Sequence, residues 1–471
     1  MKKFVFVLLI LPFVVNAQKE SKILSNINKN AEKYNSAAMQ IWNLAEVGYQ
    51  EVESAKVLQR LLEEEGFEVE KGVAGIPTAF VATYGSGKPV IGVMGEYDAL
   101  PGLSQKAIAS KDPLVADGAG HACGHHLFGV ASAAAAIATK NWLASTGTKG
   151  TVKFFGTPAE EGGSGKVYMV REGLFADTEA VLHWHPSGVN GASPATTLAN
   201  KTGKFRFYGV AAHASGAPER GRSALDGVEA MNHMVNMMRE HTTEDTRIHY
   251  VITRGGQAPN VVPDFAEVYY YVRHPDPQEV KSLWERLENA ANGAALGTDT
   301  KVEVEVTGGV YNILVNEPLQ RMVYKNLQAV GGMTYNEEET TFATEISKTL
   351  GKNAMALSSA KEIMPYKYRV VKASTDVGDV SWAVPTAGLN TATWVPGTAA
   401  HSWQAVAAGG MSIGTKGMAI AAKTLASSMQ ELLSNVEKIE EAKQAFNEAR
   451  GSDFKYEALI GDRGPALDYR K

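Results

Sequence analysis

The chain has almost no cysteine: one, Cys123, among 471 residues. A lone thiol cannot pair within the chain, so a fold held together by internal disulfides is excluded. Cys123 is therefore either a small buried apolar side chain or a ligand. Histidines at positions 121, 125 and 126 stand beside it and favour the ligand interpretation.

Long hydrophobic runs are also scarce. The one that stands out, Phe4 to Val15, follows two lysines and is interrupted by Pro12, so it falls short of the roughly 20 apolar residues that span a membrane. With small residues leading to Ala17, it is typical of a secretory signal peptide over residues 1–17. We expect export to the periplasm or the extracellular space, without stable membrane insertion after cleavage. An uncleaved anchor is the alternative.

Runs of basic residues are missing as well. Lys and Arg number 46 against 51 Asp and Glu, for a formal net charge of −5. Binding to nucleic acid depends on cationic side chains that neutralise phosphates, so no nucleic-acid partner is expected. A hydrophobic content of 44% and the chain length indicate a globular protein of two domains.

Residues 18–195 have the pattern of an α/β domain. Helical periodicity covers Ser21 to Leu62, and an alanine-rich helix is expected at 127–143. Strand-like runs bounded by glycine and proline lie at 67–69, 78–83, 90–94, 151–155 and 180–184. The last three runs lead into polar clusters: Glu96-Tyr97-Asp98, Glu160-Glu161 and His183-Trp184-His185. Functional side chains gather beyond strand carboxyl ends in α/β sheets, so these clusters predict one shared site.

Between residues 196 and 311 the predicted order is strand, helix, strand, strand, helix, strand. That order is typical of a ferredoxin-like α/β sandwich. The expected strands are 204–210, 247–253, 265–272 and 301–306, with helices at 223–241 and 278–295. We interpret this range as a second domain that interrupts the first, a catalytic α/β domain with a central mixed sheet.

The first domain is expected to resume over residues 312–471. Helices are predicted at 318–330 and 412–433. The stretch 337–365 is polar and irregular, and the tail from Gly451 is expected on the surface.

The stretch GAGHACGHH, Gly118 to His126, concentrates three of the eleven histidines and the cysteine. Thiolate, imidazole and carboxylate together bind zinc or manganese, with the thiolate favouring zinc. Side chains at i and i+2 diverge on a helix but share a side on an extended segment. We therefore expect Cys123 and His125 to converge in an extended segment, with the helix beginning near Leu127.

Glu160 and Glu161 are the second anchor of this hypothesis. One carboxylate of such a pair can bind metal while its neighbour accepts a proton from water; a solvated acidic loop is the alternative. His183 and His185 share one face of their strand, and either could be a ligand. His401, on a loop far along the chain, is a candidate last ligand.

Taken together, these motifs resemble the amidohydrolase branch of the di-metal aminoacylase and carboxypeptidase family. The resemblance runs from about residue 30 to 430 and rests on EYDALP, HACGH, PAEEGG, WHP, AAHA, PNVVP, GRSALD, STDVGDVSW and HSWQ. It implies a catalytic α/β domain interrupted by a ferredoxin-like lid that also mediates dimerisation. Two divalent ions, zinc or manganese, are implied for each subunit.

Residue by residue, the resemblance implies metal ligands at Cys123, His125, Glu161, His185 and His401. Glu160 would be the general base, and Asp98 would orient a ligand. His213 and Asn260 of the lid would contact the scissile carbonyl, brought over the cleft by domain closure or by a partner subunit. Arg222 and Arg273 are candidates for binding a substrate carboxylate, or for structural ion pairs. Relatives carry Asp where this chain has His126.

The function expected from sequence is metal-dependent hydrolysis of N-acyl or N-aroyl amino acids, with release of the free amino acid. A dipeptidase or carboxypeptidase with the same chemistry is the alternative among enzymes. An exported binding protein for amino-acid conjugates is the alternative outside them. We expect a homodimer formed through the lid, or a complex with a related second subunit.

Overall fold

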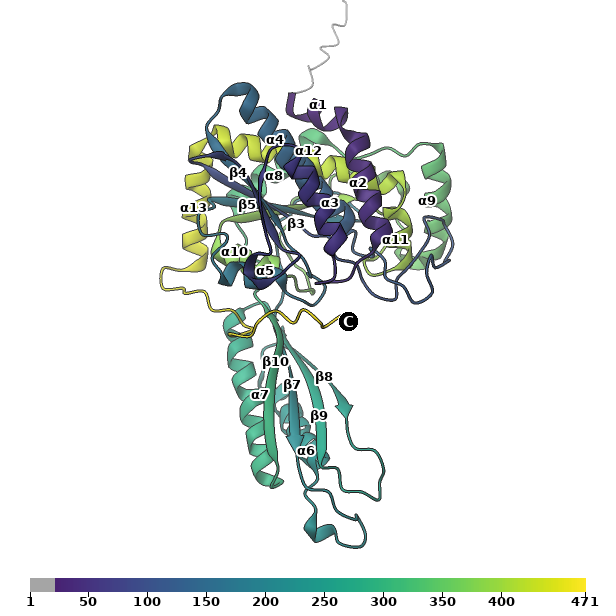
Figure 1. Ribbon diagram of the computed structural model, residues 1–471, viewed down its shortest axis with the longest axis vertical. Coiled ribbons are helices and arrows are strands. Elements are labelled where there is room, and N and C mark those ends of the chain that lie inside the picture. Colours follow the sequence, from purple (N-terminus) through teal and green to yellow (C-terminus); the bar gives the residue numbers. More distant parts are fainter. Residues whose placement is uncertain (1–21) are drawn as a thin grey trace, which may run out of the picture.

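The computed structural model of the protein describes residues 22–471, which form two domains (Figure 1). A broad α/β domain lies at the top of the view, and a narrow lid domain projects from it. The predicted signal peptide, residues 1–17, lies outside the described residues. Within residues 22–471, no helix combines the length and the apolar character needed to cross a membrane.

The α/β domain is built on a six-stranded mixed sheet in the order β1-β2-β4-β3-β5-β12. Strands β3, β4, β5 and β12 run parallel, whereas β1 and β2 add an antiparallel edge. The bounds are β1 Glu68–Lys71, β2 Phe80–Ser86, β3 Val90–Gly95, β4 Gly150–Gly156, β5 Ala180–Ser187 and β12 Thr386–Ala392. The mixed sheet confirms the predicted fold class. Strand β12 was not predicted, because TAGLNTA has neither alternation nor bulky β-formers.

Helices cover both faces of this sheet. Side chains such as Val93 and Phe154 point into a large core with α4 and α12, while Met94 and Phe155 point into a smaller core with α5 and α10. The alternation of neighbours between the two cores is the period-2 geometry of a strand buried on both sides. The helices are α1 Lys22–Lys29, α2 Ala31–Leu44, α3 Val52–Glu63, α4 His125–Thr146, α5 Gly165–Arg171, α8 Glu317–Val330, α9 Glu337–Thr349, α10 Val377–Ala383, α11 Trp403–Gly409, α12 Ser412–Ser434 and α13 Val436–Arg450.

The lid has the predicted element order. Its four-stranded antiparallel sheet runs β10-β7-β9-β8, and α6 and α7 pack together on one face. The bounds are β7 Ala199–Tyr208, α6 Ala224–Met238, β8 Arg247–Arg254, β9 Phe265–His274, α7 Pro277–Gly297 and β10 Lys301–Val310. Together with the mixed sheet, this confirms the expected architecture, while the proposed boundaries at 196 and 311 stay a prediction. A further small pair, β6 Ala195–Thr196 and β11 Arg369–Val370, lies near the junction of the domains.

Three local expectations were wrong. Helix α4 begins at His125 rather than near Leu127. The stretch predicted as irregular contains α9, which is started by a capping box in which Asn336 and Glu339 bond to each other's backbone. The tail predicted on the surface contains Leu459 and Ile460, which are 3% and 2% exposed.

Replacement of Phe154 tests the central packing. Phe154 is fully buried in β4 and stacks on Phe80 with ring centroids 5.5 Å apart. We expect Phe154→Ala to lower the free energy of unfolding by about 3–5 kcal/mol, because it leaves a cavity in a close-packed core. Denaturant titration measures this loss. Leu296→Ala, at a side chain 86% exposed, is the control and should change stability by less than about 0.5 kcal/mol.

Candidate metal centre

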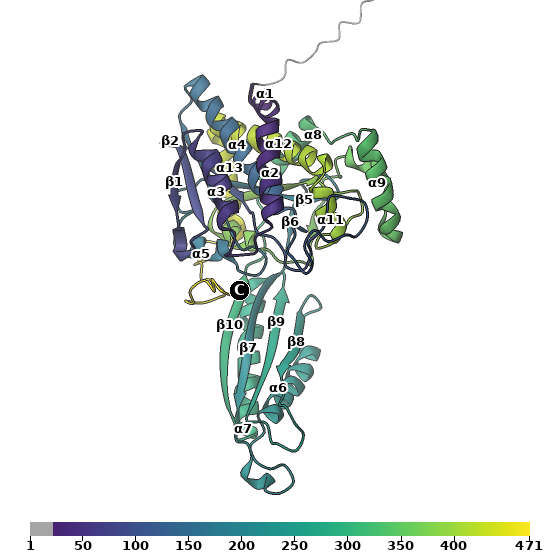
Figure 2. The same cartoon turned by 45° about the vertical axis from the view of Figure 1, so that its right-hand side comes forward.

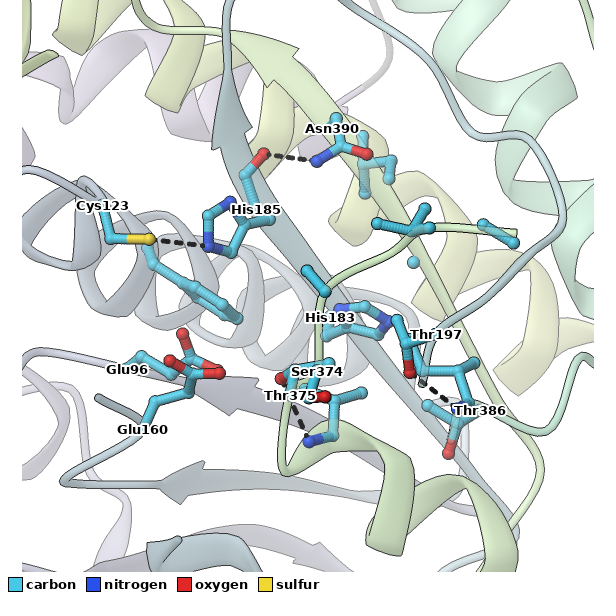
Figure 3. Close-up of a pocket in the computed structure, with 18 of the residues that line it drawn as sticks. Glu96, Cys123, Glu160, His183, His185, Thr197, Ser374, Thr375, Thr386 and Asn390 are labelled. Atoms are coloured by element: carbon cyan, nitrogen blue, oxygen red, sulfur yellow. Dashed lines mark hydrogen bonds between the residues drawn. The ribbon is translucent and has the colours of Figure 1, made fainter. Parts of the chain in front are cut away.

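The polar clusters meet at the carboxyl edge of the parallel strands, as the sequence predicts. Glu96 and Asp98 follow β3, Glu160 and Glu161 follow β4, and His185 lies near the end of β5. Figure 3 shows Glu96, Glu160, Cys123 and His185 facing one another across the cavity. This edge faces the junction with the lid.

Gly124 brings Cys123 and His125 to the same side although His125 is already helical. Gly124 has φ 79 and precedes the first residue of α4. A Cβ at this position would lie 2.7 Å from Cβ of Pro186, and the left-handed backbone itself disfavours any side chain. The expected extended segment is thus replaced by a left-handed turn, which achieves the same convergence. The helix therefore begins at His125, two residues before the predicted start.

The structure brings the five predicted ligands and the predicted base into one cluster. Candidate ligand atoms lie within 4.8 Å of one another in three overlapping groups: Cys123, His125 and His185; Cys123, Glu161 and His401; His125, Glu160 and Glu161. Sγ of Cys123 is 3.4 Å from Nε2 of His185, and Nε2 of His401 is 3.2 Å from Oε1 of Glu161. Because the groups share members, they form a single centre.

His185, and not His183, joins this cluster. Nδ1 of His185 donates to the carbonyl of Pro186 at 2.7 Å, which leaves Nε2 as the unprotonated ligand atom facing Cys123. His183 belongs to none of the groups found among residues 22–471. His183 lines the same cavity and lies away from Cys123 in the view of Figure 3.

Asp98 orients two of the predicted ligands at once. Its Oδ1 accepts a hydrogen bond from Nδ1 of His125 at 2.9 Å, and its Oδ2 accepts one from the backbone N–H of Glu161 at 2.9 Å. Burial alone would raise the pKa of Asp98, but the adjacent His125 holds that pKa below its ordinary value. The carboxylate therefore stays ionised and fixes Nε2 of His125 toward the centre.

Buried atoms of Glu96, His125 and Glu161 crowd together at the same point. Among the described residues, Oε2 of Glu96, Nε2 of His125 and Oε1 of Glu161 are buried and make no well-formed hydrogen bond. Oε2 of Glu96 lies 3.0 Å from Nε2 of His125, and Oε1 of Glu161 lies 3.2 Å from Nε2 of His401. Several potential ligand atoms thus crowd together without forming a complete hydrogen-bond network, which is the arrangement that a shared ion would satisfy. A thiol, imidazoles and a carboxylate are the donor set of a divalent transition metal, and the residues present fit such an ion.

Lys166 is a charged residue of the site that the sequence did not reveal. Its ammonium lies 2.6 Å from Oε1 of Glu96 and 2.7 Å from Oδ1 of Asp376, and all three side chains are buried. Glu160 lies close by, and burial together with the neighbouring carboxylates of Glu96 and Glu161 raises its pKa well above the ordinary value. A buried lysine leaves no periodic signal, although the acidic residues in EYDALP and STDVGDVSW could have suggested a cation between them.

His121 and His126 anchor the motif instead of extending the metal cluster. Nε2 of His121 donates to the carbonyl of Ile41 at 3.1 Å, and Nε2 of His126 donates to that of Gly409 at 3.1 Å. Burial lowers the pKa of His121 to about 3 and that of His126 well below its usual value, so both rings are neutral. They tie the ligand segment to α2 and α11.

Three of the four lid residues singled out in the sequence are remote from the cluster. The loops that follow β7 and β8 lie at the far end of the lid (Figures 1 and 2). There His213 pairs with Val261, and the carbonyl of Asn260 accepts from Ala214 N at 3.0 Å. Arg222 makes an ion pair of 2.6 Å with Asp299 at that end.

Arg273 is the lid residue that lies at the domain junction. Its guanidinium donates to Oγ of Ser374 at 3.1 Å and stacks over the ring of Tyr271. Ser374 lines a cavity of about 490 Å³ that opens from the metal cluster. Arg273 therefore lies directly behind the wall of this cavity.

Comparison with known proteins identifies the family. The chain is 43% identical over 414 residues to one subunit of the p-aminobenzoyl-glutamate hydrolase of Escherichia coli, and the match covers 82% of this chain and 86% of that protein. Residues 199–299 match the family described as peptidase dimerisation domain, M20_dimer. The chain belongs to the M20 peptidase family. Like its relatives in that family, it is a metal-dependent hydrolase of amide bonds.

Other relatives agree with this assignment. The Xaa-Arg dipeptidase of Mus musculus is 30% identical over 355 residues, covering 73% of this chain and 78% of its own. A solved aminobenzoyl-glutamate utilization protein from Klebsiella pneumoniae aligns with a TM-score of 0.60 at 18% identity, over 87% of this chain and 98% of its own. A Bacillus subtilis structure described as a dinuclear metal-binding M20 peptidase aligns with a TM-score of 0.59 at 17% identity. The alignment covers 87% of this chain and 99% of that one. These structures share the M20 fold.

Replacing Asp98 with Asn tests its double role. The two donors face different oxygens of Asp98, and the amide replaces one of these oxygens with an N–H₂ group that cannot accept from its N–H partner. We expect the affinity for divalent metal to fall by about 10- to 100-fold, measured by competition with a chelator. Asp112→Asn, in an exposed ion pair with Lys106, is the control and should bind metal as the parent does. Equal affinity of the Asp98→Asn protein would refute the orienting role.

Proposed function

We propose that this protein is an amidohydrolase that removes the acyl or aroyl group from N-acylated amino acids, p-aminobenzoyl-glutamate-like conjugates included. The observation that carries the proposal is the cavity beside the metal cluster. Cys123, Glu160, Glu161, His185 and His401 form one side of it. A substrate that fills the cavity thus places its amide bond at the cluster.

Beyond the metal cluster and Glu96, the residues that line the cavity are uncharged. Within residues 22–471, no Lys or Arg is among the residues that line it. Its remaining wall combines aliphatic and aromatic surface with hydroxyl and amide groups: Phe128, Thr197, Ile313, Val315, Gln320, Val371, Ser374, Val377, Thr386, Leu389 and Asn390. Apolar walls with a few polar groups bind apolar bodies and fix their orientation. An aroyl group matches this lining better than a charged side chain does.

The cluster supports a division of labour among the predicted residues. Cys123, His125, Glu161, His185 and His401 would hold one or two ions, zinc or manganese. Bound there, a divalent ion would supply Lewis-acid polarisation of the scissile carbonyl and a lowered pKa for water. Glu160 would accept a proton from the attacking water and return it to the leaving amine.

His213 and Asn260 are the proposed contacts to the scissile carbonyl, although both lie far from the metal cluster of their own subunit. A donor must lie about 3 Å from the developing oxyanion, and both residues are at the remote end of their own lid. They would therefore act on the active site of a partner subunit, or after a large closure of the lid. Arg222 and Arg273 would bind the carboxylate of the amino acid, Arg273 at the junction and Arg222 together with His213.

A homodimer formed through the lid is part of the proposal. Strand β8 is an edge strand whose Tyr250, Val251 and Ile252 are 38%, 55% and 39% exposed. An exposed apolar edge offers unpaired backbone groups to a second strand. A complex with a related second subunit is the alternative, since two relatives in Escherichia coli are named as different subunits of p-aminobenzoyl-glutamate hydrolase.

Export is also proposed, on the strength of the N-terminal sequence. Cleavage after Ala17 would release the mature enzyme into the periplasm or the extracellular space. N-terminal sequencing of protein from the exported fraction tests this. An intact Met1 in mature protein would contradict it.

A dipeptidase is the second candidate, favoured by the similarity to Xaa-Arg dipeptidase. The two activities separate in a hydrolysis screen of N-aroyl-glutamate, N-acyl amino acids and dipeptides with metal-loaded protein. We expect release of the amino acid from N-aroyl and N-acyl substrates at higher kcat/KM than from dipeptides. A preference for dipeptides would overturn the proposed substrate class.

Glu160→Gln tests the assignment of Glu160 as general base. We expect kcat to fall on the order of 10²- to 10⁴-fold, because the amide cannot accept the proton of water. Metal content, measured by elemental analysis, should stay unchanged. Glu172→Gln, at an exposed side chain beyond the same loop, is the control. Unchanged turnover in Glu160→Gln would remove Glu160 from the mechanism.

Mixing two inactive variants tests whether His213 acts across a dimer. We expect His213→Ala to lower kcat about 10²- to 10³-fold, as loss of an oxyanion donor does. Mixed dimers of His213→Ala with Glu160→Gln then contain one site with both residues intact, so activity should return. His241→Ala, another lid histidine, should leave kcat unchanged. Failure of the mixture to regain activity, with mixed dimers verified by mass spectrometry, would contradict action across the dimer.

A further inference from the structure

The last segment of the chain, residues 451–471, crosses the junction between the two domains. It leaves α13 and runs beneath the α/β domain toward the metal centre (Figure 1). Arg463 donates to the carbonyl of Val306 in lid strand β10 at 2.7 Å. The hydroxyl of Tyr168, in α5, donates to the carbonyl of Gly464 at 3.2 Å. The segment is thus bonded to both domains.

The segment ends on the backbone of a predicted metal ligand. The Tyr469 hydroxyl donates to the carbonyl of Glu161 at 3.0 Å, and Nη2 of Arg470 donates to the same carbonyl at 2.9 Å. A carbonyl oxygen has two lone pairs, so these two donors satisfy it fully. The N–H of Glu161 is held by Asp98. Both backbone polar groups of Glu161 are therefore fixed from outside its own loop.

The loop that carries Glu161 needs such outside contacts. Ala159 and Ser164 adopt positive φ values of 57 and 60, a conformation that residues other than glycine adopt at a cost of about 1–2 kcal/mol. Glu51 accepts from the N–H of Ala159 at 2.8 Å, and Tyr49 donates to the carbonyl of Gly163 at 2.7 Å. A backbone with such positive φ values is stable only where contacts from surrounding residues hold it in place.

Tyr469 also fits closely against the element that supports the loop. Its ring meets that of Tyr49 edge-on, with centroids 5.6 Å apart. A Cβ at Gly48 would overlap its hydroxyl. Gln50 donates to the carbonyl of Leu467 at 2.8 Å. These contacts with the α/β domain fix the position of Tyr469 independently of its hydrogen bond to Glu161.

We propose that Tyr469 and Arg470 are positioning residues of the metal centre. They hold the Glu160-Glu161 loop in the geometry that metal binding and proton transfer require. The inference rests on the proposed function, in that Glu161 is taken as a ligand and Glu160 as the base. Neither residue touches the substrate in this role. Each acts through the Glu161 carbonyl.

The test compares five variants of the full chain for metal affinity, kinetics and thermal unfolding. Tyr469→Phe and Arg470→Met each remove one donor at similar volume, and the double variant removes both. Arg463→Met is the matched control, since it releases a bond of the same segment to the lid. Metal affinity is measured with Zn²⁺ and Mn²⁺ against a chelator, which requires no substrate. It is therefore informative even if the proposed substrate class fails.

We expect the double variant to lose about 10- to 100-fold in metal affinity, as is typical when partners of metal ligands are removed. With saturating metal, kcat should fall by a similar factor while KM changes less than about twofold, because substrate contacts are intact. Arg470→Lys can still donate to the Glu161 carbonyl, so its metal affinity should be closer to that of the parent than the affinity of Arg470→Met is. Metal affinity equal to the parent would overturn the proposal. So would an equal loss in Arg463→Met, which would show a general role in stability.

Discussion

The carboxylate of Asp98 is the contact on which the centre depends. One oxygen fixes the ring of His125, and the other fixes the backbone of Glu161. His125 begins helix α4 and Glu161 lies in an irregular loop. No shared backbone element therefore fixes the position of one relative to the other. A single buried, ionised side chain at the end of β3 relates them. The separation of two ligands is thus decided by one rigid group on the most buried strand of the sheet.

This arrangement explains why the loop after β4 tolerates an unfavourable backbone. Ala159 and Ser164 have positive φ, yet the loop between them is bonded by Asp98, by Tyr49 and by the end of the chain. Strain of this kind is common at functional sites, where surrounding contacts over-determine the geometry. The free-energy cost of the strained backbone is offset by contacts with residues that are distant in sequence. The geometry of the active site therefore depends on several parts of the domain.

Much of the candidate centre could be predicted because its residue types are recognisable and because Glu161 and His185 follow or end parallel strands. Cys123, His125, Glu161, His185 and His401 were expected to converge, and they do. The mode of convergence could not be predicted, since it depends on the left-handed Gly124 and not on an extended segment. The role of Lys166 in the site was not predicted, because the burial of a charged side chain depends on partners far away in sequence, here Glu96 and Asp376. The role of residues 451–471 escaped for the same reason: Tyr469 meets Glu161 across 308 positions, and no local pattern encodes that contact.

The charge balance of the buried site leads to one last argument for a cation. Asp98, Glu96, Glu160, Glu161 and Asp376 bring five carboxyl groups into a small volume, and Lys166 is a cation beside two of them. Like charges at such distances cannot all stay ionised without compensation. Lys166 supplies one positive charge to be shared by Glu96 and Asp376, and His125 lies 2.9 Å from Asp98. The remaining carboxyl groups converge with imidazoles and a thiol. Without a further positive charge the pKa of Glu160 is raised and that of the Cys123 thiol rises through burial. A divalent ion would reverse both shifts, because it favours the deprotonated form of every group around it.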